Sequence, residues 1–319
     1  MSMLSRTADN LFWMARYTER AENTARLLDV NAQMSLLPQT LDETSRGWAS
    51  MIGISELDSV YLERYQTYDA QSVIQFMVSD LSNPSSIVSS ITAARESARA
   101  VRGSLTTEVW ETLNTTWLEL QKMLSTDALV RDPSQFFEWV KFRSHLSRGV
   151  TIGTMLDDEA KFFMCIGTFL ERADNTARLL DVKYYGSPTS QSQVQENIPR
   201  DFYHWTALLR SVSAFEVYRK TYRDVITPER VAELLILRSE MPRSLLACVN
   251  ELDANLRLVS NDRSSATQRE AGKLRAELTY GTIDEILEQG LHTWLTRFLE
   301  RINTIGGGIS RDFLVPLAD

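Results

Sequence analysis

Apolar residues recur at spacings of three and four along most of the chain, the pattern of helices that bury one face. Segments that alternate apolar and polar residues, which would indicate strands, are scarce, and only 13 Gly and 8 Pro interrupt the 319 residues. The pattern predicts helices over residues 7–34, 48–65, 69–81, 84–102, 107–124, 134–147, 156–185, 203–224, 228–238, 242–258 and 268–303. We therefore predict an all-α protein built as a multi-helix bundle.

Residues that break helices divide the chain further. The segment 186–200, GSPTSQSQVQENIPR, has no apolar periodicity and is rich in Ser, Gln and Pro, so it is predicted to be a linker or mobile loop. It separates a helical region over 1–185 from a second over 201–319, which we expect to pack on the first as one unit. Pro84 is predicted to lie in the first turn of its helix, and glycines 306–308 to end the last helix.

One polar pattern stands out because it occurs twice. Residues 19–30 read ERAENTARLLDV and residues 171–182 read ERADNTARLLDV, so the two strings differ only where Glu22 is matched by Asp174. A copied helix needs only its apolar spacing to fold, yet the polar residues also return in register. We predict an internal duplication of this helix, and the candidate binding or motif residues are Glu19, Arg20, Asn23, Arg26, Glu171, Arg172, Asn175 and Arg178.

The repeated polar residues form a stripe on the predicted helix. At about 100° per residue, Glu19, Asn23 and Arg26 lie close together and opposite the main apolar face. Apolar Phe12 falls in the same stripe, which indicates that the stripe is itself partly covered. A covered carboxylate needs a partner, but Glu19 and the adjacent Arg20 point too far apart to pair with each other. We therefore expect the Glu of one copy to pair with the Arg of the other, across a pseudo-twofold axis.

The residues leave two interpretations of this stripe open. It could be a structural clamp between helices, or it could be a ligand site whose Arg and Asn side chains hold a carboxylate, a phosphate or a peptide end. A second group of basic residues, Arg95, Arg99 and Arg102, is spaced by four and three on a predicted helix. It could bind an anion along one face, or it could be a solvated basic surface.

Composition narrows the class of protein. The net charge of -8 and the lack of a dense basic run argue against binding to nucleic acid. The N-terminal residues mix charges among apolar positions, and the most apolar run, 162–170, is too short to cross a membrane. Cys165 and Cys248 stand far apart in sequence, as expected for two reduced thiols. We expect a cytoplasmic protein without a membrane segment.

The residue patterns of well-known catalytic sites are largely missing from the sequence. His145, His204 and His292 do not form a metal-binding motif, so we predict neither a metal nor a cofactor. The two cysteines lie in apolar surroundings that make poor nucleophiles. If the protein has chemistry of its own, Glu19 or Glu171 would be the general acid or base. An Arg of the motif would then stabilise negative charge.

The two repeat-bearing segments resemble a known family. Residues 4–30, LSRTADNLFWMARYTERAENTARLLDV, and 162–182, FFMCIGTFLERADNTARLLDV, are similar to the alpha-E domain, a bacterial all-helical family with a conserved Glu-Arg motif. The similarity continues through residues 83–87, 94–102 and 242–244, and through Trp110 and Asn114. It spans nearly the whole chain.

The resemblance implies which proteins the chain works with, but it does not imply a particular reaction. Members of this family are typically encoded beside, or fused to, circularly permuted ATP-grasp proteins and transglutaminase-like peptidases. It implies a non-catalytic helical accessory or substrate-presenting component of an ATP-grasp amidoligase system. The implied partners are the ATP-grasp protein and the transglutaminase-like peptidase, and the implied ligand is a peptide or another carboxylate. The alternative is a stand-alone enzyme that acts on an amide or peptidyl substrate through its Glu-Arg motifs.

Overall fold

The computed structural model describes residues 3–35, 40–126, 128–181 and 198–314, and every regular element within them is helical. The predicted all-α class is confirmed. The elements of the first half are α1 (Ser5–Ser35), α2 (Leu41–Ile54), α3 (Asp58–Leu62), α4 (Ala70–Val78), α5 (Ile87–Ala100), η1 (Arg102–Ser104), α6 (Thr107–Leu124), α7 (Ala128–Arg131), α8 (Pro133–Thr154) and α9 (Glu159–Asp181). Those of the second half are α10 (Ile198–Ser211), α11 (Phe215–Tyr222), α12 (Pro228–Leu237), α13 (Leu245–Leu258), α14 (Ser265–Tyr280), α15 (Ile283–Glu288) and α16 (Leu291–Phe313).

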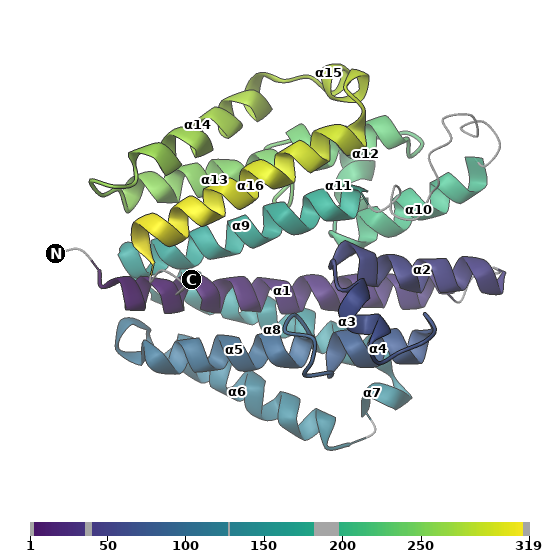
Figure 1. The fold of residues 1–319 in the computed structure, drawn as a ribbon, viewed down its shortest axis with the longest axis horizontal. Coiled ribbons are helices and arrows are strands. Elements are labelled where there is room, and N and C mark those ends of the chain that lie inside the picture. The colour runs from purple at the N-terminus through teal and green to yellow at the C-terminus, as the bar shows by residue number, and fades with distance from the viewer. Residues whose placement is uncertain (1–2, 36–39, 127, 182–197, 315–319) are drawn as a thin grey trace.

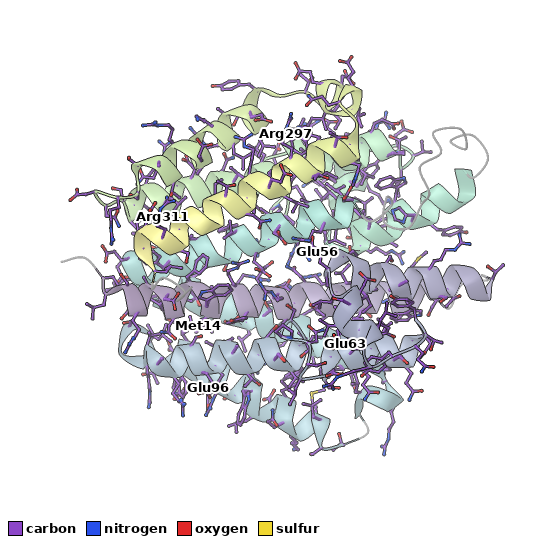
Figure 2. All side chains as sticks on the ribbon, viewed as in Figure 1. Met14, Glu56, Glu63, Glu96, Arg297 and Arg311 are labelled. Carbon is purple, nitrogen blue, oxygen red and sulfur yellow. The ribbon has the colours of Figure 1, made fainter. Side chains whose placement is uncertain are left out.

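Helix α1 lies at the centre of the molecule (Figure 1). It packs against α9 and α5 most extensively, and also against α8 and α10. On one side of α1, helix α9 is covered by α13 and α16, which in turn pack against α14. On the other side, α6 packs against both α5 and α8. Because α1 is surrounded, many of its apolar residues are buried, including Leu11, Phe12 and Leu28. Met14, which is labelled in Figure 2, is buried as well.

A glycine allows α1 and α9 to approach closely. A Cβ atom placed on Gly167 of α9 would lie 2.3 Å from the carbonyl oxygen of Phe12 in α1. That distance is far below van der Waals contact, so any larger residue would push the two helices apart. The close approach brings the polar stripes of the two helices within hydrogen-bonding distance of each other.

Three predicted helices are divided into shorter ones. The predicted helix over 48–65 breaks between α2 and α3, that over 203–224 between α10 and α11, and that over 268–303 into α14, α15 and α16. Glu56, Ser213 and Gly290 at these breaks have positive φ angles of 55°, 56° and 85°. A residue in this conformation cannot continue an α-helix. Gly and Asn are the residues that usually take positive φ angles at the end of a helix. The breaks at Glu56 and Ser213 were therefore not predicted from the sequence.

The prediction that glycines 306–308 end the last helix is wrong. They lie inside α16, which continues to Phe313. The reason is packing, because a Cβ on Gly308 would lie 2.3 Å from Oγ1 of Thr267 in α14. Thr267 is itself fixed by donating a hydrogen bond of 2.5 Å to Asp312. The glycine thus permits close contact between α14 and α16.

Two smaller predictions are also corrected. Pro84 lies in the turn before α5 and not in its first turn, because Ser86 is the N-cap and accepts a hydrogen bond from the Ser89 N–H. Of the predicted linker 186–200, residues 186–197 lie outside the described residues, and residues 198–200 already belong to α10. The division of the chain at this segment stays a prediction. None of the described helices combines the length and the apolar character that a membrane span requires.

Candidate functional site

Residues 19–30 of the first copy lie on α1 and residues 171–181 of the second lie on α9, and their motif residues pair across the helix contact. Arg172 donates from Nε and Nη2 to the two carboxylate oxygens of Glu19, both at 2.9 Å. Arg20 donates in the same way to Glu171, at 2.6 and 3.1 Å. Each pair is bidentate, the strongest geometry for a guanidinium and a carboxylate. The predicted pairing of each Glu with the Arg of the other copy is confirmed.

Around the first pair, further residues form a network that we call the Glu19 cluster. Its members are Glu19, Glu22, Asn23, Arg26, Ser144, His145, Arg148, Arg172, Ser213 and Arg243. They come from α1, α8 and α9, from the turn before α11 and from the turn before α13. The cluster therefore joins segments far apart in the sequence.

Both carboxylates of the Glu19 cluster are held by several donors. Arg243 donates to Glu19 at 3.0 Å, to Asn23 at 2.9 Å and to Glu22 at 2.6 Å. Arg148 donates from one nitrogen to Glu19 at 3.0 Å and to Glu22 at 2.5 Å. Glu22 also accepts from Arg26 and from the Ser144 hydroxyl, at 2.8 and 2.7 Å. Neither carboxylate is left without donors, although the Glu19 side chain is only 1% exposed and that of Glu22 is fully buried.

The electrostatic balance keeps both groups ionised. Burial would raise the pKa of Glu19, but Arg172 and Arg243 outweigh it and leave the pKa below its usual value. For Glu22, burial is outweighed by Arg243 and Arg148, which hold the pKa well below its usual value. Such charges are stable in the interior only while their partners stay in place.

The second pair has a different environment, which we call the Glu171 cluster. Its members are Arg16, Arg20, Glu56, Glu171, Asp174 and Arg178. Arg16 donates to Glu171 at 2.7 Å beside Arg20, while Arg178 bridges Asp174 at 2.8 Å and Glu56 at 2.7 Å. Burial would raise the pKa of Glu171. The guanidinium groups of Arg16 and Arg20 outweigh burial and lower this pKa to about 2.

The charges of the two clusters are not alike. Within the described residues, the Glu171 cluster contains three carboxylates and three guanidinium groups. In the Glu19 cluster, two carboxylates meet four guanidinium groups, those of Arg26, Arg148, Arg172 and Arg243. The Glu19 cluster therefore carries an excess of two positive charges.

Some predicted site residues lie elsewhere. Arg95 faces α6, where it donates to Asn114 at 3.1 Å and lies over the Trp117 ring at 4.6 Å. Arg99 pairs with Glu96 on the same helix. Arg102 lies in η1, beyond the end of α5, so the three arginines do not share one helical face as predicted. Asn175 of the second motif copy is half-buried. Anion binding by these arginines stays a prediction.

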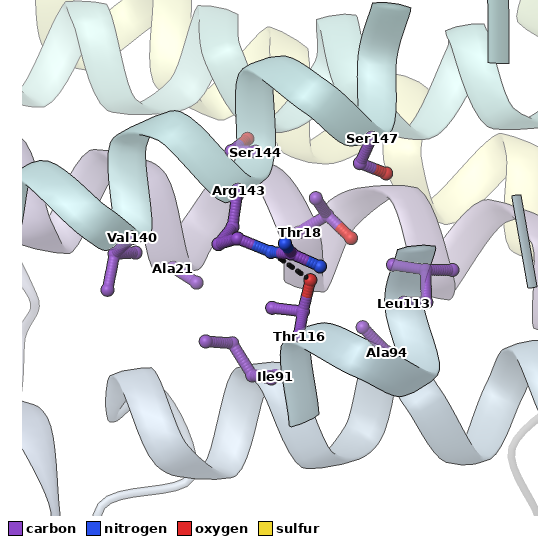
Figure 3. A pocket seen from close by; sticks show the side chains of 10 residues that line it. All are labelled: Thr18, Ala21, Ile91, Ala94, Leu113, Thr116, Val140, Arg143, Ser144 and Ser147. Carbon is purple, nitrogen blue, oxygen red and sulfur yellow. Dashed lines mark hydrogen bonds between the residues drawn. The ribbon is translucent and has the colours of Figure 1, made fainter. Parts of the chain in front are cut away.

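The sequence did not single out Arg148, Arg243 and Ser144 as site residues. Arg243 precedes the N-cap Ser244 of α13, in the segment 242–244 that carries part of the family resemblance, and Arg148 lies on α8, one residue beyond the helix predicted over 134–147. No repeat or motif spacing links these positions to Glu19, because the contact depends on how α8 and α13 pack. Figure 3 shows Ser144 at the edge of a small cavity between α1, α5, α6 and α8. Its volume of about 20 Å³ is enough for one water molecule and too small for a ligand.

The remaining chemistry of the described residues is limited. Burial raises the pKa of Cys248 to about 12, and it also raises the pKa of Cys165. His292 pairs with Asp181 at 2.7 Å beside a cavity of about 250 Å³. Within the part of the chain that the structure describes, no group of three or more His, Cys, Asp and Glu residues could hold a metal ion.

The chain is similar in sequence to a protein family and to proteins of two mycobacteria. A family model described as a predicted alpha-helical domain with a conserved ER motif matches residues 3–314. Uncharacterized proteins of Mycobacterium bovis and Mycobacterium tuberculosis are 25% identical to the chain over 323 residues, which cover 93% of this chain and 35% of theirs. The chain thus spans about a third of the length of these relatives. No solved structure matches it.

Proposed function

The chain belongs to the Alpha-E family, and on that premise we propose that it is a non-catalytic helical accessory component of an ATP-grasp amidoligase system. In this role it binds the ATP-grasp protein and presents a peptide or carboxylate substrate to it. The partner in this proposal follows from the family resemblance. The non-catalytic role follows from the state of the motif residues.

One observation carries the non-catalytic role. Every carboxylate oxygen of Glu19 and Glu171 accepts a hydrogen bond from a guanidinium group at 3.1 Å or less. A general base must have a lone pair available for the proton that it removes, and a pKa near the working pH. A carboxylate whose pKa is lowered to about 2, like that of Glu171, is a very weak base. The Glu-Arg motifs are therefore better suited to fixing helices than to moving protons.

The two thiols support the same conclusion. Cysteine attacks as the thiolate, and burial raises the pKa of both Cys165 and Cys248. A thiol with a pKa of about 12, as for Cys248, is almost entirely protonated at neutral pH. Neither residue is a favourable nucleophile for a stand-alone enzyme.

The lengths of the relatives support a component role. The chain corresponds to only 35% of the mycobacterial proteins that it matches, so in those proteins the same domain is joined to a much longer polypeptide. A domain that occurs as part of a longer protein is well suited to work beside other domains. We infer that the present chain makes a comparable association with a separate partner.

We further propose that α1 and α9 arose by duplication of one helix. The twelve-residue strings that differ at a single position support this origin, and so do the reciprocal pairs between Glu19 and Arg172 and between Glu171 and Arg20. In an ancestral dimer of identical helices, one Glu and one Arg per copy would have formed both pairs at once. Duplication would retain both residues in each copy.

The function is tested by combining the chain with a circularly permuted ATP-grasp protein of the kind that the family resemblance implies. We expect the two to co-elute in size-exclusion chromatography with ATP present, and the chain alone to release no ADP from ATP with any mixture of amino acids and peptides. With both proteins, we expect ADP release and new amide products by mass spectrometry. The control is the ATP-grasp protein alone, which should be slower or inactive.

Two results would contradict the proposal. Failure to associate with and without nucleotide would remove the accessory role. Amide chemistry by the chain alone would favour the stand-alone enzyme, provided that Glu171→Gln abolished it while the thermal unfolding temperature stayed unchanged. Loss of folding in that variant would instead be the expected effect of breaking a structural pair.

A further inference from the structure

The Glu19 cluster has more positive charge than its own carboxylates neutralise. Four guanidinium groups meet two carboxylates, and the side chains of Arg26, Arg172 and Arg243 are less than 10% exposed. Buried positive charge without a matching negative charge is costly, because solvation by water has been lost. Burial and the neighbouring arginines accordingly lower the pKa of Arg243. An anion bound at the cluster would relieve this cost.

The geometry around His145 indicates where such an anion would bind. Its Nδ1 lies 2.6 Å from Nη2 of Arg148, and its Nε2 lies 3.1 Å from Nη2 of Arg26. A neutral imidazole has one acceptor nitrogen and one N–H, whereas a guanidinium has only donors. One of the two contacts therefore sets a donor against a donor in either tautomer. A carboxylate, which accepts at both ends, fits between two guanidinium groups without this conflict.

This position is open to solvent and has apolar neighbours. His145 is exposed on α8, and Phe142 and Leu146 of the same helix are 64% and 37% exposed. The exposed Ser213, in the turn before α11, accepts a hydrogen bond of 2.7 Å from Nη1 of Arg26. The imidazole can rotate outward without disturbing the core, because it is not packed inside it. A ligand in its place would reach Arg26 and Arg148 with its charge and contact Phe142 with an apolar side chain.

We propose that the position between Arg26 and Arg148, now taken by the His145 imidazole, is a binding site for the terminal carboxylate of a peptide. The carboxylate accepts from both guanidinium groups, and the last side chain of the peptide lies against Phe142 and Leu146. The planar, two-ended acceptor and the exposed apolar neighbours favour a carboxylate over a phosphate. This inference rests on the proposed function only in taking a peptide as the ligand.

The test uses the purified full chain without any partner protein, so that its outcome is independent of the ATP-grasp association. The probes are N-acetyl-Ala-Phe with a free carboxylate, the same peptide as its C-terminal amide, and inorganic phosphate. Binding is measured by calorimetry, and the imidazole signals are followed by ¹⁵N NMR with His145→Gln to assign them. We expect the free acid to bind at least about tenfold more tightly than the amide and to shift the His145 signal.

Variants locate the site. Arg148→Gln should weaken binding of the acid at least about tenfold, because one of the two guanidinium groups is lost. His145→Ala should tighten binding severalfold, because no side chain then has to be displaced. Because His145 is exposed, the His145→Ala variant should fold, so it still tests the site if Arg148→Gln does not fold. Arg257→Gln, which removes a 59% exposed charge outside the Glu19 cluster, is the control and should leave binding unchanged.

Three results would overturn the proposal. Equal binding of acid and amide, or no binding of either, would show that the position does not recognise a carboxylate. Binding of phosphate but not of the acid would assign the position to a different anion. Binding of the acid that is indifferent to His145→Ala and does not shift the His145 signal would place the peptide elsewhere on the protein.

Discussion

The Glu19 and Glu171 clusters are built from the same twelve-residue string, yet their surroundings differ. Glu19 is reached by arginines from three other segments, α8, α9 and the turn before α13. Among the residues that the structure describes, Glu171 is reached by two arginines of α1, and these are 19% and 23% exposed. The Glu of the first copy is thus held by arginines from three segments, and the Glu of the second copy by arginines of one helix.

A single difference within the string accounts for part of this contrast. Glu22 in the first copy extends to Arg148 and Arg243, whereas the shorter Asp174 in the second pairs with Arg178 of its own helix. Glu22 therefore recruits positive charge from α8 and from the segment before α13. The comparison teaches that the repeated residues determine the two cross-helix pairs, while the non-repeated neighbours determine the charge balance around them.

The largest expected effect is a loss of stability on replacing Glu19, which should exceed the loss on replacing Glu171. Glu19→Gln would leave four guanidinium groups, three of them less than 10% exposed, with one carboxylate, so we expect a loss of about 5 kcal/mol in the free energy of unfolding. Glu171→Gln should cost less, about 3 kcal/mol, because Arg16 and Arg20 can turn toward water. Urea unfolding followed by circular dichroism measures both values. Equal losses in the two variants would contradict the difference that we draw between the clusters.

Acid should remove the stabilisation by Glu171 over a defined range. Its pKa is about 2 in the folded protein and 4.5 as the ordinary value, so its contribution is complete above pH 4.5 and is lost as the pH falls through 2. The difference in unfolding free energy between the native chain and Glu171→Gln should therefore shrink by about 3 kcal/mol between pH 6 and pH 2. Urea titrations at a series of pH values measure this difference.

The control for this experiment is a variant that also loses one carboxylate, but an exposed one. Glu138 is 68% exposed on α8, where it pairs with Lys141, so Glu138→Gln should differ little from the native chain at any pH. If the Glu171→Gln difference were as independent of pH as that of the control, the carboxylate would not be stabilised by its arginines.

A smaller effect should come from the glycine at the helix contact. Gly167→Ala would place a methyl group 2.3 Å from the Phe12 carbonyl oxygen, which separates α1 from α9 and lengthens both cross-helix pairs at once. We expect a loss of about 2 kcal/mol. Gly149→Ala in α8 is the control, because its methyl group meets nothing within 4 Å, and it should stabilise the helix by up to about 1 kcal/mol. Similar thermal unfolding temperatures for the two variants would argue against a tight contact.

The cross-helix pairs could be predicted from the sequence because both partners belong to a visible repeat. Glu19 and Arg20 point in different directions on one helix, and Phe12 in the polar stripe indicated that the stripe was covered. The helix over 107–124 was predicted with the bounds that the structure has. These features depend on local spacing alone.

The rest depends on packing that local spacing does not encode. Arg148 and Arg243 reach Glu22 only because α8 and the turn before α13 lie against α1. Similarly, the glycines of α16 were predicted to end the helix, because the sequence does not show that Thr267 of α14 packs against Gly308. The helix breaks at Glu56 and Ser213 occur at residues that rarely take positive φ angles. Such features appear only when distant segments are placed together.

The central claim is that the Glu-Arg motifs hold α1 and α9 together through reciprocal pairs. A double-mutant cycle on Glu19→Gln and Arg172→Gln, with unfolding free energies from urea titrations, measures the interaction between the two side chains directly. We predict a coupling energy of about 2 kcal/mol, because the pair is bidentate and enclosed. A coupling energy near zero, with each single variant as stable as the native chain, would contradict the account.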